Sequence, residues 1–186
     1  PEHATTSAGE EYTEEENEAA VFSAIKGPAG CIFLTFAVTL CLFPGYITTL
    51  RSTHECETHF RLKNDLYVPL SFVVFNMGDF AGRLASAKVP VERIPHLSLK
   101  LILAAASRAI FFPLLLLCVA GDQDRNRMVV ESDFYSLLVQ FAFAFTNGIL
   151  VSCSFMHAPH LVAHNTGMQE RASEIMTFAL SFGLLS

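Results

Sequence analysis

Long apolar segments alternate with shorter polar ones along most of the chain. The apolar segments occupy residues 28–50, 66–87, 97–120, 134–156 and 171–186. A helix crosses the roughly 30 Å apolar core of a bilayer with roughly 20 residues, and the first four segments reach that length, whereas the fifth reads as truncated. Because the segments are apolar on most faces, we favour an all-α polytopic membrane protein with about five transmembrane helices over a buried helical bundle in water.

The first 20 residues, PEHATTSAGEEYTEEENEAA, have a different pattern. They are polar and acidic and show no hydrophobic periodicity, which is typical of a disordered segment. The start of an acidic amphipathic helix is the alternative. We therefore expect a disordered acidic tail or loop over residues 1–26 and a membrane region over residues 27–186.

Composition supports this division. The 186 residues are 52% hydrophobic and only 16% charged, whereas soluble domains have about 25% charged residues. Seven of the 18 acidic residues lie within the first 18 positions, so the net charge of −6 comes from the tail. No basic surface indicates a nucleic-acid partner, and five scattered cysteines form no disulfide framework. The chain starts with Pro and stops within an apolar run, so we interpret it as a piece of a longer protein.

Polar residues interrupt the second apolar segment in a regular way. At 100° per residue, Phe72, Asn76, Asp79 and Arg83 fall within about 60° of one another on a helix. An isolated Asp or Arg at mid-membrane costs about 2.5–3.5 kcal/mol, so such residues pair or face a polar cavity. Asp79 and Arg83 could simply neutralise each other, but an apolar pair often stabilises a helix contact equally well. We favour a cavity that binds a neutral, hydroxylated, partly aromatic ligand.

Five motifs, in order and at matching spacing, resemble the equilibrative nucleoside transporter family. FNMGDFAGR (75–83) resembles the F-N-x-x-D-x-x-G-R motif of that family's eighth helix, and the other four motifs resemble its seventh, ninth, tenth and eleventh helices. These four are TLCLFPGYIT (39–48), SRAIFFPLLLLC (107–118), FAFTNGILVS (143–152) and ASEIMTFALSFGL (172–184). Gly78 stands where the family usually has an aromatic residue, and Ile149 where it has Tyr.

The resemblance carries implications for fold and partners. It implies a fold similar to that of the major facilitator group, of which this chain is the C-terminal half, preceded by the end of a large cytoplasmic loop. The expected surroundings are the lipid bilayer, with the plasma membrane as the location, and the missing N-terminal half. Alternating access is the implied mechanism, in which the two halves rock about a central site.

The resemblance also implies a function and a site. The expected substrate is a nucleoside, with nucleobases as further candidates, moved either passively or with proton coupling. Asp79 and Arg83 take the role of binding the sugar hydroxyls, with Asn76 and Phe72 on the same face and Phe43 as the seventh-helix aromatic. No cofactor or metal is expected. The alternatives are transport of another small polar or cationic solute, such as an organic amine, and an intramembrane enzyme or a receptor fragment.

Other polar residues have competing interpretations. Arg108 lies within an apolar segment and could extend to the membrane surface, gate a mouth of the transporter or, as we favour, pair with an acidic residue. Asn147 could contact substrate, although we favour a bond to a neighbouring helix. The three histidines His157, His160 and His164 suggest a metal site, but Pro159 interrupts them and no further ligand completes the set. A solvated loop is the preferred interpretation for residues 157–171.

Overall fold

The computed structural model describes residues 3–50, 64–117, 132–162 and 166–185. All regular elements in these ranges are α-helices or short 3-10 helices, in agreement with the predicted all-α fold. The α-helices are α1 (His3–Leu42), α2 (Asn64–Ser86), α3 (Leu97–Ser107), α4 (Phe111–Leu116), α5 (Asp133–Leu161) and α6 (Thr166–Leu185), and the 3-10 helices are η1 (Ile47–Thr49), η2 (Val91–Arg93) and η3 (Arg108–Ile110).

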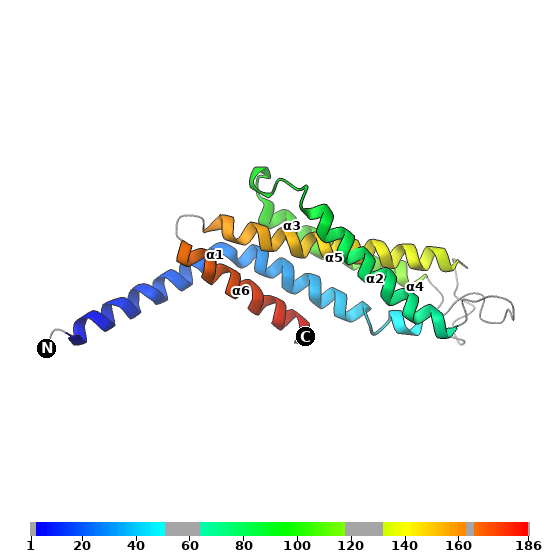
Figure 1. Ribbon diagram of the computed structural model, residues 1–186, viewed down its shortest axis with the longest axis horizontal. Coiled ribbons are helices and arrows are strands. Elements are labelled where there is room, and N and C mark those ends of the chain that lie inside the picture. The colour runs from blue at the N-terminus through cyan, green and yellow to red at the C-terminus, as the bar shows by residue number, and fades with distance from the viewer. Residues whose placement is uncertain (1–2, 51–63, 118–131, 163–165, 186) are drawn as a thin grey trace.

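Helix α1 differs from the sequence-based expectation at both ends. It begins at His3, so the segment expected to be a disordered tail is helical and projects away from the other helices (Figure 1). The segment is rich in Glu and Ala, which are strong helix formers. At the other end the helix stops at Leu42, just before Phe43 and Pro44, because proline has no N–H to continue the ladder.

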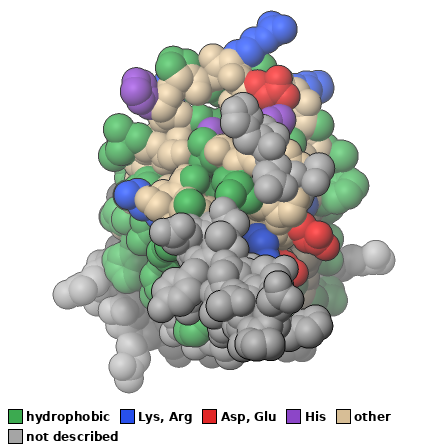
Figure 2. Space-filling model, turned by 90° about the vertical axis from the view of Figure 1, so that its left-hand side faces the viewer, with side chains coloured by type: hydrophobic (Ala, Val, Ile, Leu, Met, Phe, Trp, Pro, Cys, Tyr) green, Lys and Arg blue, Asp and Glu red, His purple; other side chains and the backbone are tan. Residues whose placement is uncertain are grey.

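Helix α5 occupies the centre of the structure. It contacts each of the other five α-helices, and Asp133 in its first turn suits the positive end of the helix dipole. It continues to Leu161, so the expected loop from residue 157 begins later, and His164 lies outside the described residues. Viewed from the end where α5 finishes and α6 begins, most of the charged and histidine side chains that can be seen gather in the upper part of the molecule, next to hydrophobic ones (Figure 2).

Within the residues that the structure describes, three helical segments are long and apolar enough to cross a membrane. They are Ala19–Thr49, Leu97–Leu116 and Asp133–Leu161. The third of the expected spans is divided into α3, η3 and α4, because Pro113 deprives an upstream carbonyl of its helical donor. Helices α2 and α6 have 23 and 20 residues but carry more polar side chains, among them Asp79 and Arg83 in α2.

The outer faces of the helices are unusually apolar. Large hydrophobic side chains that are more than half exposed occur on α2, α3, α5 and α6, including Phe80, Leu103, Phe134 and Phe178. Side chains of this kind are rarely so exposed over a whole water-soluble protein. The exposed apolar faces agree with an integral membrane protein.

Candidate substrate-binding site

Asp79 and Arg83 form an ion pair toward the C-terminal end of α2, with Arg83 in its last turn. The Nε atom of Arg83 donates a hydrogen bond to Oδ2 of Asp79 over 2.7 Å. The residues are four apart, so they lie one turn above each other on the same helix face. The Asp79 side chain is 18% exposed and that of Arg83 is 50% exposed. The predicted charged pair therefore forms at the outer surface of the described helices and remains accessible.

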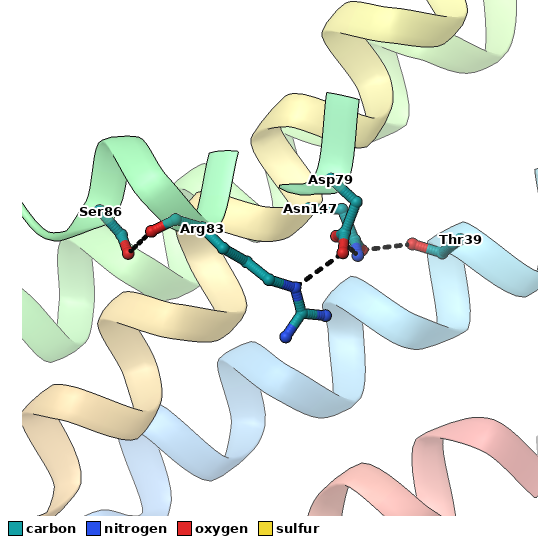
Figure 3. Close-up of polar contacts among 5 residues, drawn as sticks. All are labelled: Thr39, Asp79, Arg83, Ser86 and Asn147. Atoms are coloured by element: carbon teal, nitrogen blue, oxygen red, sulfur yellow. Dashed lines mark hydrogen bonds and ion pairs between the residues drawn. The ribbon is translucent and has the colours of Figure 1, made fainter. Parts of the chain in front are cut away.

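Only one nitrogen of the Arg83 guanidinium is used by this pair. Its two terminal nitrogens make no hydrogen bond to any residue that the structure describes, and the close-up shows them pointing away from Asp79 (Figure 3). A guanidinium donates in a rigid planar fork and remains charged at any physiological pH. Arg83 thus presents two N–H₂ groups to whatever lies against this face.

Asn147 connects the ion pair to α1. Its Nδ2 atom on α5 donates to Oδ1 of Asp79 over 2.8 Å, and its Oδ1 atom accepts from the hydroxyl of Thr39 on α1 over 2.9 Å (Figure 3). Each carboxylate oxygen of Asp79 therefore has one donor from the protein. Because a carboxylate oxygen has two lone pairs, each can accept one further hydrogen bond from a ligand.

Three glycines bring α2 and α5 into direct backbone contact. A Cβ atom on Gly78 would lie 2.7 Å from the carbonyl oxygen of Phe141, one on Gly82 would collide with the carbonyl oxygen of Phe145, and one on Gly148 with that of Asp79. Small residues allow membrane helices to approach this closely. The close crossing explains how the short Asn147 side chain reaches Asp79, and why Gly78 replaces a larger residue.

Two of the predicted aromatic residues meet at α2, closer to the start of that helix than the pair is. Phe43, just after α1, packs edge-on against Phe72 of α2 with ring centroids 4.7 Å apart. Phe43 also stacks on Phe75, which lies outside the predicted stripe, with ring centroids 4.0 Å apart and ring planes 6° apart. The rings join α2 to the residues that follow α1 and provide a flat apolar surface.

Asn76 does not join the charged pair. Its Nδ2 atom donates to the backbone carbonyl of Phe72 on its own helix over 2.7 Å, and the side chain is exposed. Of the five predicted site residues, the structure therefore links Asp79 with Arg83 and Phe43 with Phe72. Asn76 lies on the outer surface with its amide oxygen available to a ligand.

Arg108 in η3 is 1% exposed and is the largest fully buried side chain. The expected acidic partner is not found among the described residues. Instead its terminal nitrogens donate to the backbone carbonyls of Thr35 and Phe143 and to the hydroxyl of Thr39. Its guanidinium carbon lies 4.4 Å from the centroid of the Phe143 ring, a cation–π contact.

Two of these residues were not identified as site residues from sequence. Thr39 is the first residue of the motif TLCLFPGYIT (39–48), and the sequence favours a bond to a neighbouring helix for Asn147. Asn147 does bond a neighbouring helix, but the group that it bonds is the candidate carboxylate itself. The feature of the sequence that could have identified both residues is that each lies within one of the five motifs, Thr39 in residues 39–48 and Asn147 in residues 143–152.

The histidines have separate partners. His157 Nε2 lies 3.0 Å from the hydroxyl of Ser98, and His160 Nε2 lies 3.5 Å from a carboxylate oxygen of Glu92. Within the described part of the chain no three His, Cys, Asp or Glu residues are grouped as metal ligands. The groups at Asp79 and Arg83 can instead accept and donate hydrogen bonds beside an aromatic surface, which suits reversible binding of a polyhydroxylated ligand.

The chain is similar to known transporters over most of its length. Residues 2–186 match the family described as nucleoside transporter. The chain is 31% identical to equilibrative nucleoside transporter 3 of Rattus norvegicus over 83% of its own length and 32% of that protein. It is 32% identical to nucleoside transporter FUN26 of Saccharomyces cerevisiae over 88% of its own length and 31% of that protein. It is 31% identical to equilibrative nucleoside transporter 2 of Homo sapiens over 88% of its own length and 34% of that protein. The chain thus spans about a third of the length of these relatives, which are named as transporters.

Proposed function

Because the chain belongs to the nucleoside transporter family, we propose that it forms the C-terminal membrane half of a carrier that moves nucleosides across a membrane by alternating access. The family match and the names of the relatives support the substrate class. We further propose that this half lies in the lipid bilayer and functions together with an N-terminal half. Residues 1–26 would form the end of a cytoplasmic loop that joins the two halves. The protein is integral to a membrane, and surface biotinylation would test our proposal of the plasma membrane.

The observation that carries the proposal is the exposed pair of Asp79 and Arg83. The carboxylate oxygens of Asp79 have lone pairs left for two hydroxyl donors, and the free nitrogens of Arg83 can donate to hydroxyl or ring oxygens. A ribose presents adjacent hydroxyl groups at this spacing. Phe72 and Phe43 lie on the same side and offer a flat apolar surface beside the sugar.

The surroundings of the pair support a second half that covers it. Val73, Met77, Phe80 and Leu84 on α2 are each more than half exposed, and they flank two charged residues. A charged pair against lipid is unfavourable by several kcal/mol, so this face requires protein or a water-filled cavity. A cavity between two halves satisfies the charged residues and leaves the apolar ones to pack.

Uptake of radiolabelled uridine and adenosine tests the proposal. The full-length gene product would be expressed in cells that lack nucleoside transporters, with unlabelled nucleosides, nucleobases and organic amines as competitors and with external pH varied. We expect saturable uptake that Asp79→Asn abolishes while the protein still reaches the membrane. Undiminished uptake by Asp79→Asn would contradict the site, and uptake of amines but not of nucleosides would contradict the substrate class. Dependence on external pH would distinguish proton coupling from passive exchange.

A further inference from the structure

The buried guanidinium of Arg108 has no acidic partner among the described residues. Its two terminal nitrogens donate three hydrogen bonds, and its Nε atom, although buried, makes none. A buried charge with an unsatisfied donor is destabilising, and apolar residues of similar size often stabilise a helix contact better. A role in packing alone therefore does not account for an arginine here.

The contacts of Arg108 act on the Thr39 hydroxyl. Thr39 has one proton and two acceptors within reach, namely the carbonyl of Thr35 at 2.6 Å and Oδ1 of Asn147 at 2.9 Å. One Arg108 nitrogen donates both to that carbonyl, at 2.9 Å, and to the Thr39 oxygen, at 3.1 Å. The carbonyl has two lone pairs and can accept from both groups. By donating to the Thr39 oxygen, Arg108 polarises the hydroxyl, which strengthens its donation to Oδ1 of Asn147.

The orientation of the Asn147 amide is set by its two partners, Thr39 and Asp79. With its Oδ1 atom accepting from Thr39, its NH₂ group must face Asp79, where it donates over 2.8 Å. The reversed amide would place an oxygen against a carboxylate oxygen, which is repulsive. Hydrogen bonds therefore run in one direction, from Arg108 through Thr39 and Asn147 to Asp79, and every step donates toward the carboxylate.

We propose that Arg108 is a positioning residue that sets the hydrogen-bonding geometry of Asp79 through Thr39 and Asn147. The inference rests on the proposed function, in which Asp79 binds the hydroxyls of the sugar. Arg108 itself does not touch the substrate. Its effect is to keep the Asn147 amide turned so that one oxygen of Asp79 is held toward α5 and the carboxylate keeps a fixed angle toward a ligand.

Discrimination between sugars is the readout that distinguishes positioning from packing. In the full-length protein, we would measure inhibition of radiolabelled uridine uptake by unlabelled uridine and by 2′-deoxyuridine and 3′-deoxyuridine. We expect Thr39→Val, which keeps the shape of the residue but removes the hydroxyl, to raise the KM for uridine about tenfold, the loss expected for one hydrogen bond to a charged site. We expect the same variant to reduce the preference for uridine over at least one deoxy analogue about threefold or more.

Four further variants complete the experiment. Thr39→Ser retains the hydroxyl and should restore both the KM and the sugar preference. Thr177→Val, which removes an exposed hydroxyl bonded within α6, should change neither. Arg108→Lys should lower the sugar preference as Thr39→Val does. The double variant that carries both changes should raise the KM for uridine by no more than about tenfold, whereas two independent tenfold effects would multiply to about a hundredfold.

The outcomes separate the two proposals. Loss of sugar preference in Thr39→Val with rescue by Thr39→Ser supports the positioning role, even where Arg108→Lys fails to reach the membrane. Unchanged preference in Thr39→Val, with normal uptake by the unaltered protein, overturns the positioning role alone. Absence of uridine and adenosine uptake by the unaltered protein overturns the proposed function and the inference together.

Discussion

The Nδ2 atom of Asn147 on α5 lies 2.8 Å from Oδ1 of Asp79 on α2 and donates a hydrogen bond to it. This bond joins the charged face of α2 to the most central helix of the structure. It also uses an oxygen of Asp79 that Arg83 leaves available, since Arg83 bonds Oδ2. The candidate carboxylate is thus held from two helices before any ligand binds, which reduces the ordering that a ligand must impose.

Asn147→Ala should weaken transport without unfolding the protein. The change removes the donor to Oδ1 of Asp79 and one of the two acceptors of the Thr39 hydroxyl. Loss of such a bond to a charged group costs about 1.5–3 kcal/mol. We expect kcat/KM for uridine uptake to fall at least about tenfold. The control is Thr146→Ala, which removes a hydroxyl bonded to Phe143 on the same helix. Equal losses in the two variants would contradict a specific role for Asn147.

Arg83→Lys should fail to transport although it conserves the charge. An ammonium can pair with Asp79, but it cannot present two further donors in a plane as the free nitrogens of Arg83 do. We expect nucleoside uptake to fall to background at normal surface expression, measured by biotinylation and radiolabel uptake together. The same replacement at the exposed Arg93 in η2 should leave uptake unchanged. Retention of most uptake in Arg83→Lys would show that charge alone suffices.

Phe43→Ala should reduce affinity more than Phe43→Leu. The ring of Phe43 lies 4.0 Å from that of Phe75 and 4.7 Å from that of Phe72, so removing it opens a gap against α2 and exposes the other two rings. Leu restores most of the volume but not the flat face. We expect the KM for uridine to rise in both variants, by the larger factor in Phe43→Ala. An unchanged KM in both would place the substrate elsewhere.

Gly148→Ala and Gly82→Ala should destabilise the protein strongly. In each case the added methyl group meets a backbone carbonyl of the facing helix, and backbone cannot move aside as a side chain can. Overpacking of this kind typically costs about 1–3 kcal/mol or more. We expect a lower melting temperature in detergent for both variants. Gly30→Ala in α1 has no atom within 4 Å of the new methyl group and should be neutral or slightly stabilising.

Hydrophobic periodicity and residue chemistry were sufficient to predict the all-α architecture and the charged pair. The apolar segments predicted all-α membrane architecture, and the spacing of Asp79 and Arg83 predicted their pairing, because both depend on the local geometry of a helix. The helical start of α1 was only the alternative to a disordered segment, because an acidic sequence without an apolar stripe has little to distinguish the two.

Contacts between segments far apart in the sequence could not be predicted from local sequence patterns. Asn147 is 68 residues from Asp79, and Thr39 is 108 residues from Asn147. Only the packing of α1, α2 and α5 brings these residues together. Arg108 shows the same limit, since an arginine in an apolar segment was expected to find an acid, whereas it found backbone carbonyls and a hydroxyl whose positions depend on two other helices.

The glycine contacts between α2 and α5 also bear on how the protein moves. At Gly78, Gly82 and Gly148 the backbones of α2 and α5 lie directly against each other, and Asn147 bonds Asp79 across this contact. We therefore expect α2 and α5 to move together as one body. In the alternating-access cycle that we propose, the hinges would then lie outside this pair, and the candidate carboxylate would keep its supporting bond.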